Sequence, residues 1–86
     1  MGLPQAWVDA THAVVGIDFR EVGGVPIIDT GVLEHHTDEF SAHRDVAMRR
    51  GRGARVFVAV VIDGRISPED FKKFSEVLRE YYSDRV

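Results

Sequence analysis

The spacing of apolar residues changes several times along the chain, and each spacing predicts a different element. Near the start, Trp7, Ala10 and Val14 recur on one helical face. Pro4 precedes them and suits the first turn of a helix. A short helix is therefore expected over residues 3–13.

Two stretches rich in β-branched residues, Val14–Val22 and Val25–Thr30, flank the pair Gly23–Gly24. Consecutive glycines can both take positive φ, so a two-residue turn can close a hairpin there. The two stretches are therefore predicted to pair as antiparallel strands. A later stretch, Arg55–Ile62, is apolar at almost every position, which predicts a strand that is covered on both faces and central in the sheet.

A second helix is predicted to begin at Thr37, whose hydroxyl can accept hydrogen bonds from the free amides of a helix start. The acidic residues Asp38 and Glu39 suit the positive end of the helix dipole. The basic pair Arg49–Arg50 and then Gly51 suit its finish.

The last helix is predicted over Ser67–Tyr82, because Ser67 followed by Pro68 and two acidic residues is a strong helix-start signal. Its aromatic and aliphatic residues keep the spacing of one buried stripe. That stripe comprises Phe71, Phe74, Leu78 and Tyr81.

These elements indicate an α/β (α+β) fold in the order α-β-β-α-β-α. We expect a small mixed sheet with a central buried strand and flanking helices. A chain of 86 residues can enclose only one hydrophobic core, so residues 1–86 are expected to form a single domain.

Composition narrows the class of protein without naming a function. The chain is 44% hydrophobic and 29% charged, which is typical of globular proteins. It contains no cysteine, so disulfides and thiolate metal sites are excluded. The longest apolar run, Val56–Ile62, is far shorter than the roughly 20 residues that a membrane-spanning helix needs. The first residues also lack the pattern of a signal peptide, so we expect a cytoplasmic protein without a membrane partner.

Positive charge is concentrated in one segment of a chain whose net charge is −3. Glycines at 51 and 53 would let the backbone approach an anion closely. The segment is therefore a candidate contact for nucleic-acid phosphates, and the alternative is a solvated helix end and loop. Its members are Arg44, Arg49, Arg50, Arg52 and Arg55.

Two short acidic motifs lie on successive predicted strands. The stretch Gly16-Ile17-Asp18-Phe19 and the stretch Ile27-Ile28-Asp29-Thr30-Gly31 lie ahead of a predicted helix and strand. This arrangement resembles the core of the PD-(D/E)xK nuclease superfamily, in its compact virus-type replication-repair branch.

The resemblance implies that Asp18 and Asp29 are catalytic residues that hold a divalent metal. Their carboxylate oxygens are hard ligands, which suit Mg²⁺. The family lysine falls at Gly31 in this chain. The resemblance therefore implies a nucleic-acid-associated domain that binds DNA or RNA, or cleaves phosphodiesters weakly with a metal. The alternative for the two aspartates is an outward strand position and a turn residue.

The triplet Asp29-Thr30-Gly31 also matches the aspartic-protease motif. The chain beyond it is too short for that family's flap and second motif.

A second polar cluster lies around the start of the second helix. Its histidine and carboxylate side chains are suitable ligands for zinc or another transition metal, and their spacing places several on one helical face. The alternative is a set of solvated histidines, and we expect no stabilisation by zinc. The cluster comprises His35, His36, Glu39 and His43.

The last helix is unusually aromatic, and Tyr81 and Tyr82 extend that character to its end. A small domain can use part of such a face to pair with another chain. The alternative function is therefore a non-enzymatic protein-interaction module, which associates as a homodimer or with a partner protein.

Overall fold

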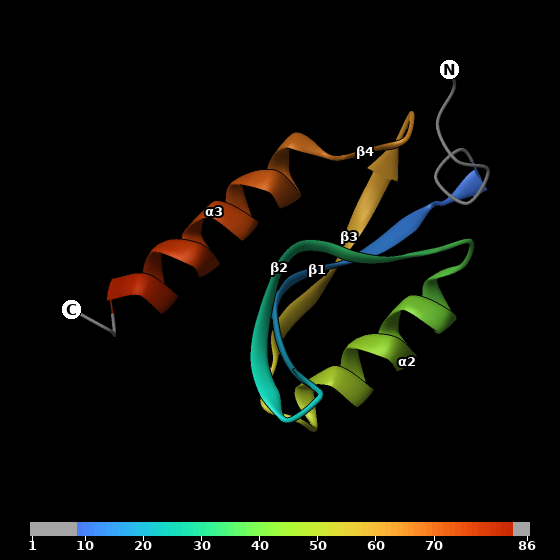
Figure 1. Cartoon of the computed structure of the whole chain (residues 1–86). Coiled ribbons are helices and arrows are strands. Elements are labelled where there is room, and N and C mark those ends of the chain that lie inside the picture. The colour runs from blue at the N-terminus through green and yellow to red at the C-terminus, as the bar shows by residue number, and fades with distance from the viewer. Residues whose placement is uncertain (1–8, 84–86) are drawn as a thin grey trace, which may run out of the picture.

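The computed structural model describes residues 9–83, which form one four-stranded sheet and two long helices (Figure 1). The strand order is β2-β1-β3-β4, and every neighbouring pair is antiparallel. The elements are β1 (His12–Val22), β2 (Val25–His36), α2 (Glu39–Arg50), β3 (Arg55–Ile62), β4 (Arg65–Ile66) and α3 (Pro68–Ser83).

The β1–β2 hairpin is the longest feature of the sheet. Gly23 and Gly24 close it with φ angles of 58° and 82°, as the glycine pair predicted. Pairing runs from Val22 opposite Val25 to His12 opposite His36, with one bulge, because Leu33 has no residue opposite it. β2 is therefore six residues longer at its C-terminal end than the predicted Val25–Thr30.

The two long helices cover opposite faces of the sheet (Figure 1). On one face, β1 and β3 side chains pack against Phe74 and Val77 of α3. On the other face, Val14 and Val56 pack with Val46 of α2. The α+β class with flanking helices is confirmed, and the core lies around β1 and β3.

Gly16 brings β1 and β3 unusually close together. Its φ is 145°, and a Cβ placed there would lie 2.1 Å from the carbonyl oxygen of Arg55. No other residue type fits this position without moving the strands, so the curvature of the central pair depends on a glycine.

Several expectations about the elements need correction. The expected helix over residues 3–13 falls mostly outside the described residues, and its end is wrong, because His12 and Ala13 belong to β1. The sheet is antiparallel in each described pair, and the added strand β4 changes the element order. β3 has its predicted bounds and lies between β1 and β4, although β4 pairs only with its last two residues.

The helix starts differ in how well they were predicted. Asp38, and not Thr37, caps α2, because its carboxylate accepts a 2.8 Å hydrogen bond from the backbone N–H of Ser41. Ser67 precedes α3 as predicted, and its hydroxyl donates to Asp70 at 2.7 Å. In α3, Tyr81 is buried at 5% exposure, but Phe71 is 59% exposed and does not belong to the core.

None of the helices in residues 9–83 is both long enough and apolar enough to cross a membrane.

Candidate functional site

Asp18 is a buried polar residue whose carboxylate contacts two arginines. It lies on β1 and is only 3% exposed. One carboxylate oxygen accepts a 2.8 Å hydrogen bond from the backbone N–H of Phe19. The other accepts from Arg49 at 2.7 Å and from Arg52 at 3.0 Å. Asp18 therefore ties the end of α2 and the following loop to the middle of β1.

The same network continues along α2 to the end of β2. Arg49 donates through Nε to Asp45 at 2.9 Å, and the other oxygen of Asp45 lies 2.8 Å from Nε2 of His36. Burial alone would raise the pKa of Asp45, but the hydrogen bonds with His36 and Arg49 outweigh it and hold that pKa below its ordinary value. Burial would likewise lower the pKa of Arg49, and its two aspartate partners raise it instead. Both pKa shifts favour the charged forms of Asp45 and Arg49.

Asp18 and Asp29 are directly opposite each other in the β1–β2 register, so they share one face of the hairpin as a metal pair would require. Each carboxylate is already engaged by arginine. Asp18 accepts from two guanidinium groups, and Asp29 forms an ion pair with Arg20. A Mg²⁺ ion would have to displace these partners. Their role as metal ligands stays a prediction.

The histidine cluster does not converge on one point. His36 turns to Asp45, whereas His43 and Glu39 form an exposed pair with atoms 3.4 Å apart. Burial lowers the pKa of His35. Within residues 9–83, no group of three or more His, Asp or Glu side chains is placed to hold a metal ion.

The five arginines of the basic segment divide into different environments. Arg49 is largely buried in the Asp18 network, while the side chain of Arg52 remains 51% exposed. Arg50 donates to the carbonyl oxygen of Val56 at 2.9 Å, and the Arg55 guanidinium lies 5.6 Å from the ring centroid of Tyr81. Arg44 is exposed on α2. The five arginines therefore differ in their partners and in their exposure, and a role in phosphate contact stays a prediction.

The outer edge of β3 is covered by specific contacts. Arg50 donates to the carbonyl oxygen of Val56. At Val60, the N–H donates to the Asp70 carboxylate at 2.9 Å, and the carbonyl oxygen accepts from the backbone N–H of Ser67 at 2.9 Å. β4 pairs with the strand beyond these residues. Within residues 9–83, the N–H of Val56 and the backbone groups of Val58 lie between the covered positions, a stretch too short for regular pairing with a further strand.

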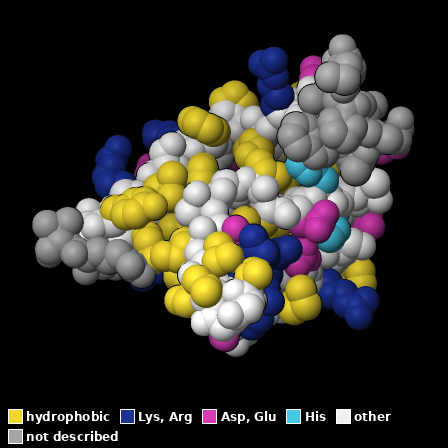
Figure 2. Space-filling model, viewed as in Figure 1, with side chains coloured by type: hydrophobic (Ala, Val, Ile, Leu, Met, Phe, Trp, Pro, Cys, Tyr) yellow, Lys and Arg dark blue, Asp and Glu magenta, His cyan; other side chains and the backbone are white. Residues whose placement is uncertain are grey.

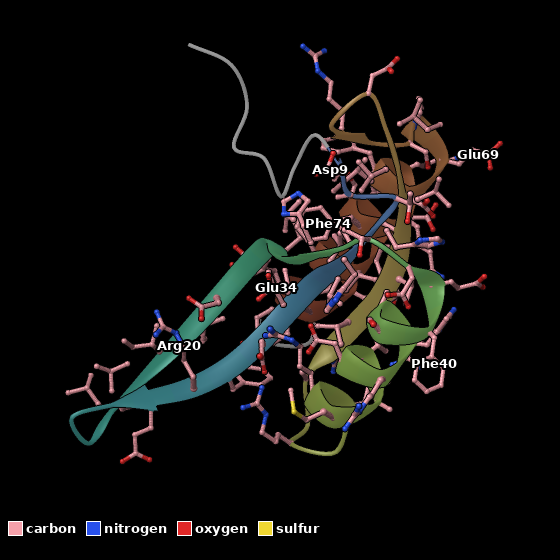
Figure 3. The ribbon with its side chains drawn as sticks, turned by 90° about the vertical axis from the view of Figure 1, so that its right-hand side faces the viewer. Asp9, Arg20, Glu34, Phe40, Glu69 and Phe74 are labelled. Atoms are coloured by element: carbon pink, nitrogen blue, oxygen red, sulfur yellow. The ribbon has the colours of Figure 1, made fainter. Side chains whose placement is uncertain are left out.

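The outer edge of β2 is different. It is 12 residues long, and no strand of the described chain pairs with it on the side away from β1. The hairpin projects away from both long helices, with Arg20 on the projecting part (Figure 3). Hydrophobic side chains reach the surface along α3 and over the hairpin (Figure 2). Those of the hairpin include Val22, Val25, Ile28 and Val32, which are 42–59% exposed.

A shallow hollow lies beside this edge, where the end of β2 faces the start of α3. Its lining is mainly apolar and includes Val32, Ile66 and the exposed Phe71. The exposed edge of β2 and this hollow form one surface, which we call the β2 surface.

The sequence analysis missed the β2 surface. It placed the candidate interface on the last helix, where Phe71 and Tyr82 are exposed, and that placement stays a prediction. Four further exposed hydrophobic residues lie on the hairpin. The signal was present in the length of the apolar stretch after Gly24, but the strand order that leaves β2 at an edge depends on contacts between distant residues.

Comparisons of the chain with protein-family models, with curated proteins and with solved structures found no match.

Proposed function

We propose that this chain is a non-enzymatic interaction module that forms a homodimer through the outer edge of β2. The observation that carries the proposal is the contrast between the two edges of one sheet. The β3 edge is covered by Arg50, Asp70, Ser67 and β4, and the longer β2 edge has no such cover in the described chain.

An uncovered edge strand presents a row of backbone donors and acceptors that can pair with another strand. Proteins usually protect such edges with charges, proline or bulges. From Val25 to Leu33 the only charged residue is Asp29, which already pairs with Arg20. Pro26 and the bulge at Leu33 protect the ends of this stretch and leave its middle open.

The exposed side chains favour pairing over solvation. Ile28 and Val32 are 46% and 42% exposed on the face that α3 covers elsewhere. A second strand laid along β2 would remove apolar surface from water while it satisfies the open backbone groups. These two gains support association of whole folded chains.

The test compares the wild type with Ile28→Lys by light scattering over a wide range of protein concentration. We expect a dimer for the wild type and a dissociation constant at least about tenfold higher for Ile28→Lys, because the new charge would be buried at the interface. Ile62→Lys is the matched control, since Ile62 is 56% exposed but lies on β3. A wild-type monomer at all concentrations, or equal weakening by the control, would contradict the proposal.

A second candidate function is nucleic-acid contact, which the exposed arginines of the basic segment favour. Arg44 and Arg52 are the informative pair, because Arg49 is largely buried and Arg50 covers the β3 edge. Arg52 also donates to Asp18, but its side chain is 51% exposed, and Arg49 keeps its own bond to that carboxylate. Phosphate contacts release counterions, so binding through both residues should weaken as salt rises.

The deciding variant is Arg44→Gln with Arg52→Gln, and its charge-matched control is Lys72→Gln with Arg79→Gln on α3. Each phosphate contact contributes roughly 0.9 to the slope of log K against log salt concentration. If the basic segment contacts duplex DNA, the first variant therefore reduces the magnitude of that slope by about 1.8, and the control variant leaves it unchanged. Absence of wild-type binding at low salt would exclude this function.

A further inference from the structure

We infer that the strand that docks on β2 is β2 of a second copy, antiparallel, with the two-fold axis of the dimer passing through Thr30. This inference rests on the proposed function and adds to it the register of the pairing. Three features of the hairpin define that register: the direction of its backbone groups, the limits of the open stretch and the position of its charge.

The contacts of β3 determine which residues of β2 point their backbone groups outward. The carbonyl of Val56 and both backbone groups of Val60 bond to residues on the outer side of β3. The alternate β3 residues therefore bond to β1, through Val15 and Ile17 among others. On β1 this leaves Gly16 and Asp18 to bond with β2.

The residues opposite Gly16 and Asp18 are Gly31 and Asp29, so these two point inward to β1. The alternate residues Ile28, Thr30 and Val32 point their N–H and C=O groups outward. The closing turn indicates the same directions. A two-residue turn is flanked by a hydrogen-bonded pair, here Val22 with Val25, so Val25 and every second residue after it point their backbone groups to β1.

The open stretch is short and has clear limits. Pro26 is the next outward residue toward the turn, and it has no N–H to donate. Toward the other end, the bulge at Leu33 reverses the alternation. Ile28, Thr30 and Val32 are thus the three residues that can pair regularly with another strand.

A two-fold axis at Thr30 pairs all three of these residues with residues of the second copy. Thr30 then faces Thr30 of the second copy, and Ile28 faces Val32 of the second copy on both sides of the axis. Apolar side chains meet across the new pair, and the threonines meet at its centre, which are favourable cross-strand combinations. Asp29 faces Gly31 of the second copy, so no like charges are opposed.

The neighbouring registers are worse. An axis at Asp29 places the two Asp29 carboxylates directly opposite each other, which is destabilising. That axis also sets Val32 against Pro26 of the second copy. An axis at Gly31 sets Ile28 opposite position 34, beyond the bulge. Charge and apolar pairing therefore favour the axis at Thr30.

The test is a scan with single cysteines, which is clean because the chain contains none of its own. In this register the two Thr30 Cα atoms lie about 5.5 Å apart, within the range for a disulfide. Thr30→Cys should therefore form a covalent dimer under oxidising conditions. Two copies of Ile28→Cys place their thiols roughly 14 Å apart, four residues out of register, and should not link.

A mixture of Ile28→Cys and Val32→Cys is the second expected success, because these positions face each other. Each variant is first checked by light scattering for an intact dimer, and the same oxidation in denaturant is the control for random linking. Linking of Ile28→Cys, Asp29→Cys or Val32→Cys by itself would overturn the register and leave edge pairing in place. A dimer that links at none of these positions would overturn the β2 edge as the interface, and a wild-type monomer would overturn both proposals.

Discussion

At the scale of single residues, Asp18 accounts for much of how α2 is held on the sheet. Its carboxylate is almost fully enclosed and accepts hydrogen bonds from two arginines and one backbone amide. The arginine partners lie 31 and 34 residues away in the sequence. An aspartate in a strand is therefore a tie between elements here, and its local sequence gives no sign of it.

We predict that Asp18→Asn lowers the free energy of unfolding by about 3 kcal/mol, because it breaks a buried ion pair. The value is at the lower end of the usual range, since Arg49 keeps its contact with Asp45. Urea unfolding measures the effect. Asp29→Asn is the control, and its more exposed pair with Arg20 should contribute less than about 1 kcal/mol. Equal losses in both variants would contradict this account of Asp18.

Asp45 predicts a dependence of stability on pH. Its pKa is lowered in the folded protein, because the bonds with His36 and Arg49 outweigh the effect of burial. The unfolded chain therefore binds this proton more readily, and the stabilisation is present above about pH 4 and is lost as the pH falls through the lower folded pKa. Unfolding free energies measured between pH 3 and 6 should fall more steeply toward acid for the wild type than for Asp45→Asn.

At the scale of elements, α3 shows how far the spacing of apolar residues can predict the buried side of a helix. Phe74, Leu78 and Tyr81 are at least partly buried, as expected, but Phe71 points to solvent. Val77 takes part in the core in its place. The stripe was correct in period and wrong at its first turn, where Phe71 lines the hollow between α3 and β2 and does not enter the core.

We predict that Phe74→Ala lowers the free energy of unfolding by about 2–3 kcal/mol, somewhat below the cost of truncating a fully buried phenylalanine. Phe71→Ala makes the same chemical change at a 59% exposed site and should cost less than about 1 kcal/mol. Thermal melts of both variants provide the comparison. Similar shifts for the two would show that α3 does not pack as described.

The strands differ in how far their sequence determined them. β3 was predicted with correct bounds because its apolar residues are nearly continuous. The end of β2 was missed because Gly31 and Glu34 interrupt the pattern, and only pairing with β1 extends the strand through them. The position of Gly16 was also invisible in sequence, since its constraint comes from the carbonyl of Arg55 on a neighbouring strand.

At the scale of the whole molecule, a dimer through β2 would couple stability to protein concentration. Association that requires the folded chain stabilises it by mass action. We therefore predict that the wild-type melting temperature rises with protein concentration, whereas that of Ile28→Lys rises less. Calorimetry over a hundredfold concentration range measures both, and a constant wild-type melting temperature would contradict the prediction.

The covered edge of β3 also decides how many copies can join. A sheet with two open edges would recruit chains at both ends and grow into a fibre, whereas a sheet with one open edge is finished when that edge meets its own copy. In a dimer formed through β2, Arg50, Asp70 and Ser67 would stop growth at two chains, because they cover the β3 edge. Without these contacts, both edges of the sheet would be open to pairing.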